Sequence, residues 1–324
     1  METIRSIEYD SEKQRLYVES GNFTGISKGV DEYLYNEIQR YYRDITIGST
    51  IWKKEHTLKE LNNLRMIHHL TPQSLGLLDI ALWDLFGKIQ QLPVYKILGG
   101  FRDRIPAYTE SNGDFDLISS EINMAQKSGF IGHQISFSNT KIITEQLSEI
   151  DKFERHSLLL LATGRNSLNL SDSLHLGKKL QSAGFHWFQN PLSGNDTQAL
   201  KKLNMSLTLP VIESKFATSS PSFAMKALTD RVVDRLSFEI PTMGGITDAI
   251  KWARGSEAIG MNCEINWTDA IGPNAAIHVF GAIRNAELIS WRPNNSNFKV
   301  SKGHVIIPST PGLGFESIEK VKKL

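Results

Sequence analysis

The chain is nearly devoid of cysteine and contains no long apolar run. Cys263 is the single cysteine among 324 residues, which excludes an internal disulfide and any metal site built from several thiolates. It lies in a strand-like context, so we interpret it as a buried, inert thiol. No stretch approaches the roughly 20 apolar residues that span a bilayer, and the first residues lack the basic and apolar regions of a signal peptide. We therefore expect a cytoplasmic protein without a membrane partner.

An excess of charge of either sign is also missing. The 36 basic residues balance 35 acidic ones, which leaves a net charge of +1. A balance of this kind favours neither a nucleic-acid partner nor an acidic tail. Apolar residues make up 40% of the chain and charged residues 22%, a composition typical of one or two soluble globular domains.

The spacing of apolar residues differs between the N-terminal part of the sequence and the rest. Residues 1–24 alternate on both sides of a turn at 10–13, which predicts a β-hairpin. From Val30 to about Lys88, apolar residues recur at three- and four-residue spacing, which predicts helices with one face on a core. After a break at 92–100, short apolar strands alternate with helical segments. Strands are predicted at 134–137, 158–161, 187–188, 211–212, 236–238 and 261–265, with helices at 174–183, 222–228 and 247–259.

The repeated strand–helix units predict a parallel sheet. Their number fits a closed barrel better than an open sheet. In such a barrel, the functional site lies where the strands run into the loops that follow them. We therefore expect the residues at the ends of the predicted strands to carry the chemistry.

Several motifs together resemble one protein family. Residues 81–88 read ALWDLFGK, followed by LPVY at 92–95 and LGG at 98–100, while GGIT stands at 244–247 and PGLG at 311–314. In this order they resemble the mandelate racemase/muconate-lactonizing enzyme branch of the enolase superfamily over nearly the whole chain. We expect the motifs to be architectural, with Trp83 in the core and Asp84 as a structural hydrogen-bonding group.

The resemblance implies an α/β fold in which a TIM-like (β/α) barrel carries an α+β N-terminal capping domain. The capping domain is expected at 1–100 and the barrel at 101–300. A C-terminal segment at 301–324 is expected to return to the capping domain. The family resemblance also makes a homo-oligomer the expected assembly.

The family's chemistry uses Mg²⁺ together with Lys or His bases to take a proton next to a carboxylate. The resemblance implies three acidic Mg²⁺ ligands, at the ends of the third, fourth and fifth strands. Here these positions fall on Ala162 or Thr163, on Gln189 and on Glu213. Only Glu213 is a carboxylate, and Mg²⁺ prefers several oxygen ligands in octahedral array. Glu213 and Gln189 therefore predict at most a weak or vestigial Mg²⁺ site, and we expect no cofactor.

The family's bases are replaced as well. Its second strand carries a pair of basic residues, and strand alternation puts Gln134 and Ser136 in these positions, with His133 facing outward. Neither Gln134 nor Ser136 acts as a base near neutral pH. Across the barrel, Glu239 and Asn266 match positions where relatives carry acid/base residues, and Glu239 alone keeps that capacity.

Three hypotheses remain open at this point. In the first, the chain has kept the fold, lost the proton chemistry, and binds a small carboxylate or other anion or is vestigial. In the second, Glu213 and Glu239 form a metal-independent acid/base pair, with Lys215 or Arg165 in place of the metal. In the third, it is a Mg²⁺-dependent racemase, epimerase, cycloisomerase or acid-sugar dehydratase. The residues expected to contact a substrate are Gln134, Ser136, Arg165, Lys215 and Asp269.

Overall fold

The capping domain begins with three antiparallel strands, where the sequence predicted two. The computed structural model describes residues 2–111, 117–137, 157–215, 221–292 and 298–315. Strands β1 (Ser6–Asp10) and β2 (Arg15–Ser20) form the predicted hairpin, and β3 (Phe23–Lys28) adds to β2. The third strand was missed because Gly25 weakens its pattern. A Cβ at Gly25 would lie 2.1 Å from the carbonyl oxygen of Ala81, so glycine lets a helix pack directly on this strand.

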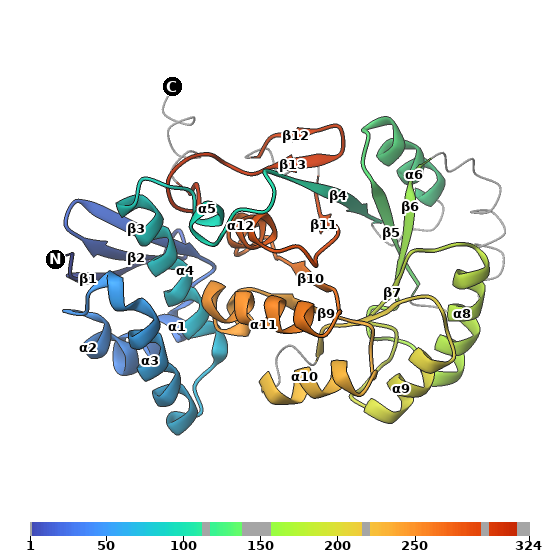
Figure 1. Ribbon diagram of the computed structural model, residues 1–324, viewed down its shortest axis with the longest axis horizontal. Coiled ribbons are helices and arrows are strands. Elements are labelled where there is room, and N and C mark those ends of the chain that lie inside the picture. Colours follow the sequence, from blue (N-terminus) through green and yellow to red (C-terminus); the bar gives the residue numbers. More distant parts are fainter. Residues whose placement is uncertain (1, 112–116, 138–156, 216–220, 293–297, 316–324) are drawn as a thin grey trace.

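Helices cover one face of this small sheet (Figure 1). The longest, α4, starts with a proline in its first turn and is buried on almost every side. It packs against β3 on one side and against the barrel on the other. The helical elements of this domain are α1 (Glu32–Glu37), the π-helix η1 (Ile38–Tyr42), α2 (Arg43–Thr46), the 3₁₀ turn η2 (Ile51–Lys53), α3 (Lys54–His68), α4 (Pro72–Ile89) and α5 (Val94–Ile97).

Among the described residues, eight parallel strands form the barrel. Each pairs with its neighbour from β4 through β10, β11 pairs back onto β4, and β11 also contacts β10, so the sheet closes. The six predicted strands are found within about two residues of their expected bounds. The strands are β4 (Arg104–Glu110), β5 (Gly132–Ser136), β6 (Leu159–Thr163), β7 (Phe188–Gln189), β8 (Val211–Glu213), β9 (Arg235–Glu239), β10 (Cys263–Asn266) and β11 (Ile289–Ser290).

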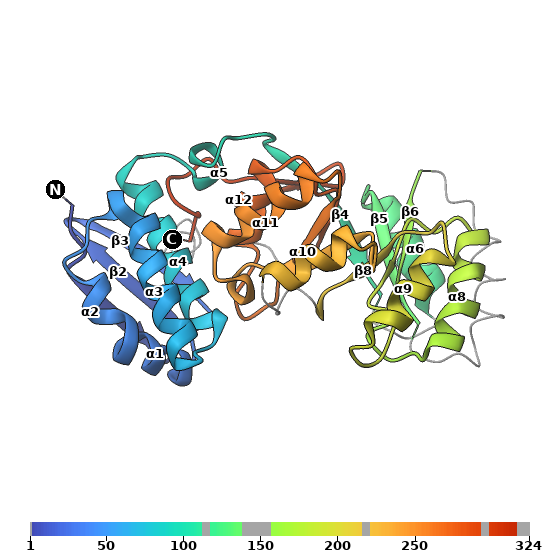
Figure 2. The same cartoon turned by 60° about the horizontal axis from the view of Figure 1, so that its bottom comes forward.

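Helices surround the barrel, with α6, α8 and α9 at the end of the molecule far from the capping domain (Figure 2). The three helices predicted from periodicity appear as α8, α10 and α11. The helices are α6 (Ile118–Lys127), α8 (Leu170–Ser182), α9 (Thr197–Met205), α10 (Pro221–Thr229), α11 (Ile246–Ala258) and α12 (Asn274–Ala282), with a 3₁₀ turn, η5 (Pro241–Met243), before α11. A short antiparallel pair, β12 (Val300–Ser301) and β13 (His304–Ile306), extends the sheet at β4.

Buried polar groups fasten the capping domain to the barrel and to the C-terminal segment. The carboxylate of Asp84 on α4 accepts hydrogen bonds from the backbone of Ile26 (2.9 Å) and of Leu313 (2.7 Å). Trp83 is buried and donates to the hydroxyl of Thr247 on α11 at 2.9 Å. Both residues therefore have the architectural roles expected from the motif, and residues near Leu313 lie against the capping domain.

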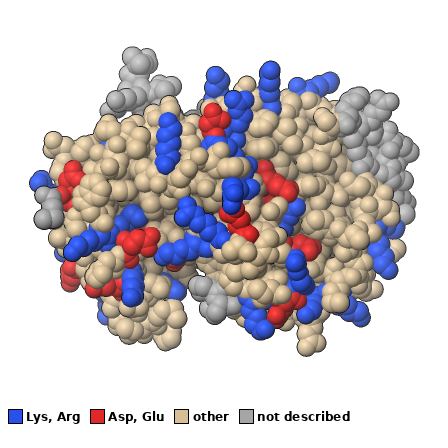
Figure 3. Space-filling view, in the orientation of Figure 1, with Lys and Arg blue, Asp and Glu red and all other residues tan. Residues whose placement is uncertain are grey.

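The surface mixes both signs of charge. Basic and acidic side chains are interspersed over the face drawn in Figure 3. Among the described helices, none is both long and apolar enough to cross a membrane.

Candidate active site

A cavity of about 410 Å³ lies at the mouth of the barrel, where the strands end. Each of seven barrel strands, β4 to β7 and β9 to β11, contributes its last residues or the loop that follows. The lining residues are Tyr108, Glu110, Ser111, Gln134, Ser136, Thr163, Arg165, Gln189, Asn190, Glu239, Asn266, Trp267, Thr268, Ser290 and Arg292.

Six residues singled out from the sequence meet in this cavity. They come from strands spread over more than 130 positions of the chain, and they are Gln134, Ser136, Arg165, Gln189, Glu239 and Asn266. The third-strand position is also settled, because Thr163 lines the cavity while Ala162 packs among the apolar side chains outside the barrel. The residues expected to face inward on the second, fourth and sixth strands do line the cavity, and on the third strand Thr163 is the one of the two candidates that does so.

The fifth strand differs from the expected register by one residue. Ile212, not Glu213, pairs with Gln189, and Ile212 packs inside the barrel with Tyr108, Leu161 and Trp187. Because neighbouring residues of a strand face opposite sides, Glu213 does not share the inner face with Gln189, and it is not among the cavity-lining residues. The position expected to carry the third Mg²⁺ ligand therefore holds an isoleucine.

The side chains of Glu213 and Lys215 form hydrogen bonds with backbone groups of nearby loops. Glu213 is only 1% exposed, and one carboxylate oxygen accepts hydrogen bonds from the backbone of Ser214 (2.9 Å) and Lys215 (3.1 Å). Burial raises the pKa of Glu213, and these bonds lower it in part. The ammonium of Lys215 donates to the backbone carbonyls of Leu192 and Gly194. The structure therefore does not bring Glu213 and Lys215 into the cavity with Glu239.

Asp269 lies on the rim rather than in the cavity. Its carboxylate forms an ion pair with Arg292, and both side chains are largely exposed. Arg292 itself lines the cavity, and its guanidinium lies 5.5 Å from the centroid of the Trp267 ring. Asp269 thus acts on the cavity through its ion pair with Arg292 and through its charge, which raises the pKa of Glu110.

A chain of neutral hydrogen bonds crosses the floor of the cavity. The amide nitrogen of Gln134 donates to the amide oxygen of Gln189 at 2.8 Å, and the amide nitrogen of Gln189 donates to the hydroxyl of Ser237 at 3.2 Å. From the other side, the amide nitrogen of Asn266 donates to the same hydroxyl at 2.6 Å. Gln134, Gln189 and Ser237 are buried, so the network satisfies polar groups that are costly to leave unpaired.

The residues at this floor do not fit Mg²⁺. The three positions implied by the family are Thr163, Gln189 and Ile212, which together offer a hydroxyl, an amide already bonded at both ends and no charge. Mg²⁺ sheds its water reluctantly and is held in proteins by carboxylates. Throughout the described part of the chain, no group of three His, Cys, Asp or Glu residues is arranged to hold a metal. The donor set thus disagrees with the metal that the resemblance implies.

Two charged residues of the cavity were missed by the sequence reasoning. Glu110 ends β4, directly after the alternating run that starts at Ile105, and this position was the available signal. Arg292 follows β11, a strand of two residues that was not among the predicted strands. Burial raises the pKa of Glu110, while the nearby charges of Arg292 and Arg165 lower it.

Glu239 is the one predicted acid/base residue that lines the cavity. Burial raises the pKa of its carboxyl group, and no cation among the described residues offsets the shift. Within the ranges that the structure describes, its carboxylate has no hydrogen-bond donor and no ion-pair partner. A half-buried carboxylate that faces a cavity without a partner is a candidate for contact with a ligand.

His133 lies outside the barrel, as expected from strand alternation. One ring nitrogen is 2.8 Å from the hydroxyl of Thr109, and the other is 3.7 Å from Glu121 on α6. Burial lowers the pKa of His133 to about 4, so the ring is neutral at physiological pH. It therefore has a structural role between β5 and α6.

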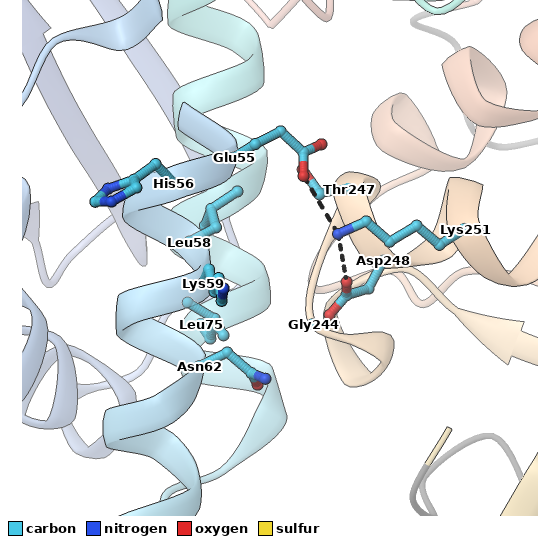
Figure 4. A pocket seen from close by; sticks show the side chains of 10 residues that line it. All are labelled: Glu55, His56, Leu58, Lys59, Asn62, Leu75, Gly244, Thr247, Asp248 and Lys251. Atoms are coloured by element: carbon cyan, nitrogen blue, oxygen red, sulfur yellow. Dashed lines mark hydrogen bonds and ion pairs between the residues drawn. The ribbon is translucent and has the colours of Figure 1, made fainter. Parts of the chain in front are cut away.

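A second cavity, of about 430 Å³, lies outside the barrel between α3 and α11. Figure 4 shows Lys251 of α11 reaching toward Glu55 of α3, at 3.3 Å, and toward Asp248, at 3.4 Å. These side chains are mostly exposed and already paired with one another. The barrel mouth is therefore the better candidate for a functional site.

Comparisons with known proteins agree with this architecture. A family model described as "Enolase C-terminal domain-like" matches residues 151–321, just over half of the chain. The arabinonate dehydratase of Saccharolobus solfataricus is 23% identical over 253 residues, which cover 73% of this chain and 68% of that protein. The L-Ala-D/L-Glu epimerase of Clostridium acetobutylicum is 24% identical over 310 residues, which cover 91% and 86%.

Solved structures match over nearly the whole chain. The structure of D-glucarate dehydratase from Agrobacterium tumefaciens, complexed with magnesium, has a TM-score of 0.83 at 22% identity and covers 98% of this chain and 96% of its own. That of the 3,6-anhydro-D-galactonate cycloisomerase from Zobellia galactanivorans also has a TM-score of 0.83, at 21% identity, with 98% and 99% covered. The chain therefore belongs to the enolase C-terminal domain-like family, in the mandelate racemase/muconate-lactonizing enzyme branch of the enolase superfamily.

Proposed function

We propose that the barrel mouth binds a small carboxylate and does not carry out Mg²⁺-assisted proton abstraction. The observation that carries the proposal is the change of charge between floor and rim. The floor is neutral where a metal and basic residues would be needed, while Arg165 and Arg292 line the cavity above it. A guanidinium can bind a carboxylate through two parallel hydrogen bonds, and a concave site of about 410 Å³ is large enough for a small organic acid.

The chemical groups that the family's reaction requires support the proposal that this site binds a carboxylate without Mg²⁺-assisted proton abstraction. A proton next to a carboxylate is weakly acidic, and its removal needs a base together with a cation that stabilises the dianion. At the second strand, Gln134 and Ser136 supply no base, and at the metal positions Thr163, Gln189 and Ile212 supply no carboxylate. Relatives named as racemases, epimerases and dehydratases are only 23–24% identical to this chain in the cases above, so their activities do not transfer by similarity alone.

A metal-independent isomerase or lyase is the second candidate. Glu239 on β9 and Glu110 on β4 both line the cavity, and burial raises the pKa of each. A carboxyl group with a raised pKa exchanges protons more readily near neutral pH. In this reading Glu239 is the base, and Arg165 or Arg292 holds the substrate carboxylate. The isomerases and lyases among the relatives favour it.

Binding and turnover can be tested in one series. Sugar acids and amino acids are titrated calorimetrically with MgCl₂ and, separately, with EDTA. We expect binding that is unaffected by EDTA and is weakened about tenfold by Arg165→Gln or Arg292→Gln, as for the loss of one charged hydrogen bond. Lys226→Gln, at an exposed side chain of α10 outside the cavity, is the control.

Proton exchange then separates the two candidates. Bound acids are incubated in D₂O with EDTA, and α-deuteration is followed by NMR. Exchange that disappears in Glu239→Gln would establish the metal-independent enzyme. Exchange that requires Mg²⁺ would overturn the proposal.

A further inference from the structure

In the hydrogen bonds of the cavity floor, the amide side chains act as donors through their N–H groups. Among the described residues, two of their amide oxygens are therefore left as free acceptors that face the cavity. Gln134, Gln189 and Asn266 each use an amide N–H within the network. The amide oxygens of Gln134 and Asn266 receive none of the hydrogen bonds formed among the described residues. Both side chains line the cavity, so these two oxygens remain available to a ligand.

Glu239 adds a negative charge to the same side of the cavity. It ends β9 and pairs across the ladder with Asn266 at the end of β10. As described above, its carboxylate has no donor or cation among the described residues. Trp267 follows Asn266 in the chain and also lines the cavity, but its ring already lies 5.5 Å from the guanidinium of Arg292. Two amide oxygens and a carboxylate together match a positively charged group that donates hydrogen bonds.

The two cations of the lining come from loops after other strands than β9 and β10. Arg165 lies in the loop after β6, and Arg292 lies after β11, where its pairing with Asp269 keeps it at the rim. A ligand that bridges the two regions needs an acceptor at the rim and a donor at the floor. This arrangement is opposite to one in which a metal and lysines on the floor bind the carboxylate.

We propose that the ligand of the barrel mouth is a small amino acid, bound with its ammonium group on the floor beside Glu239 and its carboxylate at the rim beside Arg165 and Arg292. The inference rests on the proposed carboxylate site and adds the second functional group and the orientation. Glu239 then acts as the counter-ion of the ligand, and the two amide oxygens complete the hydrogen bonds of the ammonium group.

Probes of matched length test the inference. Binding of 4-aminobutyrate, 5-aminopentanoate and 6-aminohexanoate is measured by ligand-detected NMR in EDTA, beside butyrate, pentanoate and hexanoate. We expect the best amino acid to bind at least about tenfold more tightly than its matched acid, as for a charge-assisted hydrogen-bonded pair. Glu239→Gln is expected to abolish that preference. Glu55→Gln, in the second cavity, is the control and should keep it.

The outcomes separate this inference from the proposal on which it rests. If amino acids and matched acids bind equally to the unaltered protein, and the arginine variants weaken both, the carboxylate site stands and the ammonium subsite is wrong. If an amino-acid preference persists in Glu239→Gln, the subsite is also wrong. If no probe binds at millimolar concentration, both proposals fail.

Discussion

The two ends of the barrel differ in whether their charged side chains are paired with one another. At the base, Arg235 lies 2.8 Å from Glu264 and 2.8 Å from Glu287, and His186 lies 2.8 Å from Glu287. At the mouth, the floor is an uncharged chain of amides and a hydroxyl, and Glu239 stands beside it without a partner among the described residues. A single strand shows both patterns, because Arg235 begins β9 and Glu239 ends it.

The contrast indicates which charges belong to the fold. Arg235 and Glu264 are buried, and a buried charge is tolerated only when it is paired and hydrogen-bonded. The charged groups at the mouth reach a cavity, where water or a ligand can solvate them. The charges at the base therefore depend on one another within the packed barrel, whereas the charges at the mouth are available for binding. Four predictions test this difference, from the largest expected effect to the smallest.

Removing the cation at the base should have the largest effect. Arg235→Met leaves Glu264 and Glu287 without their common partner. Breaking a buried ion pair on one side costs about 3–5 kcal/mol. We expect the free energy of unfolding, measured by urea denaturation, to fall by this amount. The matched control is Lys226→Met, which breaks an exposed pair with Asp230 and should leave the free energy of unfolding almost unchanged. Equal losses in the two variants would contradict the comparison.

Adding a charge to the floor should have the next largest effect. Gln189→Glu buries a carboxylate within the neutral network, and burial raises its pKa above the unfolded value of about 4.3. The cost should be small at pH 4, where the group is protonated in both states, and should grow to about 1–3 kcal/mol by pH 8. Urea denaturation across this range checks it. Gln189→Met, which adds no titratable group, should lose a similar amount at every pH.

A fall in pH should lower the stability of the fold through Glu287, which lies at the base of the barrel. The hydrogen bond from His186, followed by those from Arg235, lowers the pKa of Glu287 to about 2. A lowered pKa stabilises the folded state above the unfolded pKa, and this contribution is lost as the pH falls from about 4.3 toward 2. The side chain is 36% exposed, so solvent screening reduces the effect to about 1 kcal/mol. Between pH 5 and 3, Glu287→Gln should lose less stability than the unaltered protein. Parallel losses would argue against this role.

Magnesium should have no effect at the mouth. A ligand at 100 times its dissociation constant raises the free energy of unfolding by about 2.7 kcal/mol. We expect no shift of the thermal midpoint between EDTA and millimolar MgCl₂, because Thr163, Gln189 and Ile212 supply no carboxylate. A clear stabilisation by Mg²⁺ would mean that the floor holds a metal after all, and the Mg²⁺-dependent hypothesis would return.

The architecture was largely predictable, and the site was predictable in part. The motif at 81–88 and the alternation of strands and helices indicated the family and the barrel, because both depend on local patterns. The same alternation placed Gln134 and Ser136 at the mouth and His133 outside it. Glu110 and Arg292 were not found, since neither belongs to a motif and they are far apart in sequence before the barrel brings them together.

The sequence by itself determined the order of the strands, the core motifs, and which residues stand at the positions that match the family's metal-binding and basic residues. The tertiary structure alone decided the register of β8. All three of its residues are buried, so burial cannot reveal which of them faces inward. Only the pairing of Ile212 with Gln189 does so. The direction of the floor network was likewise decided there, because it depends on side chains from four strands meeting at hydrogen-bonding distance.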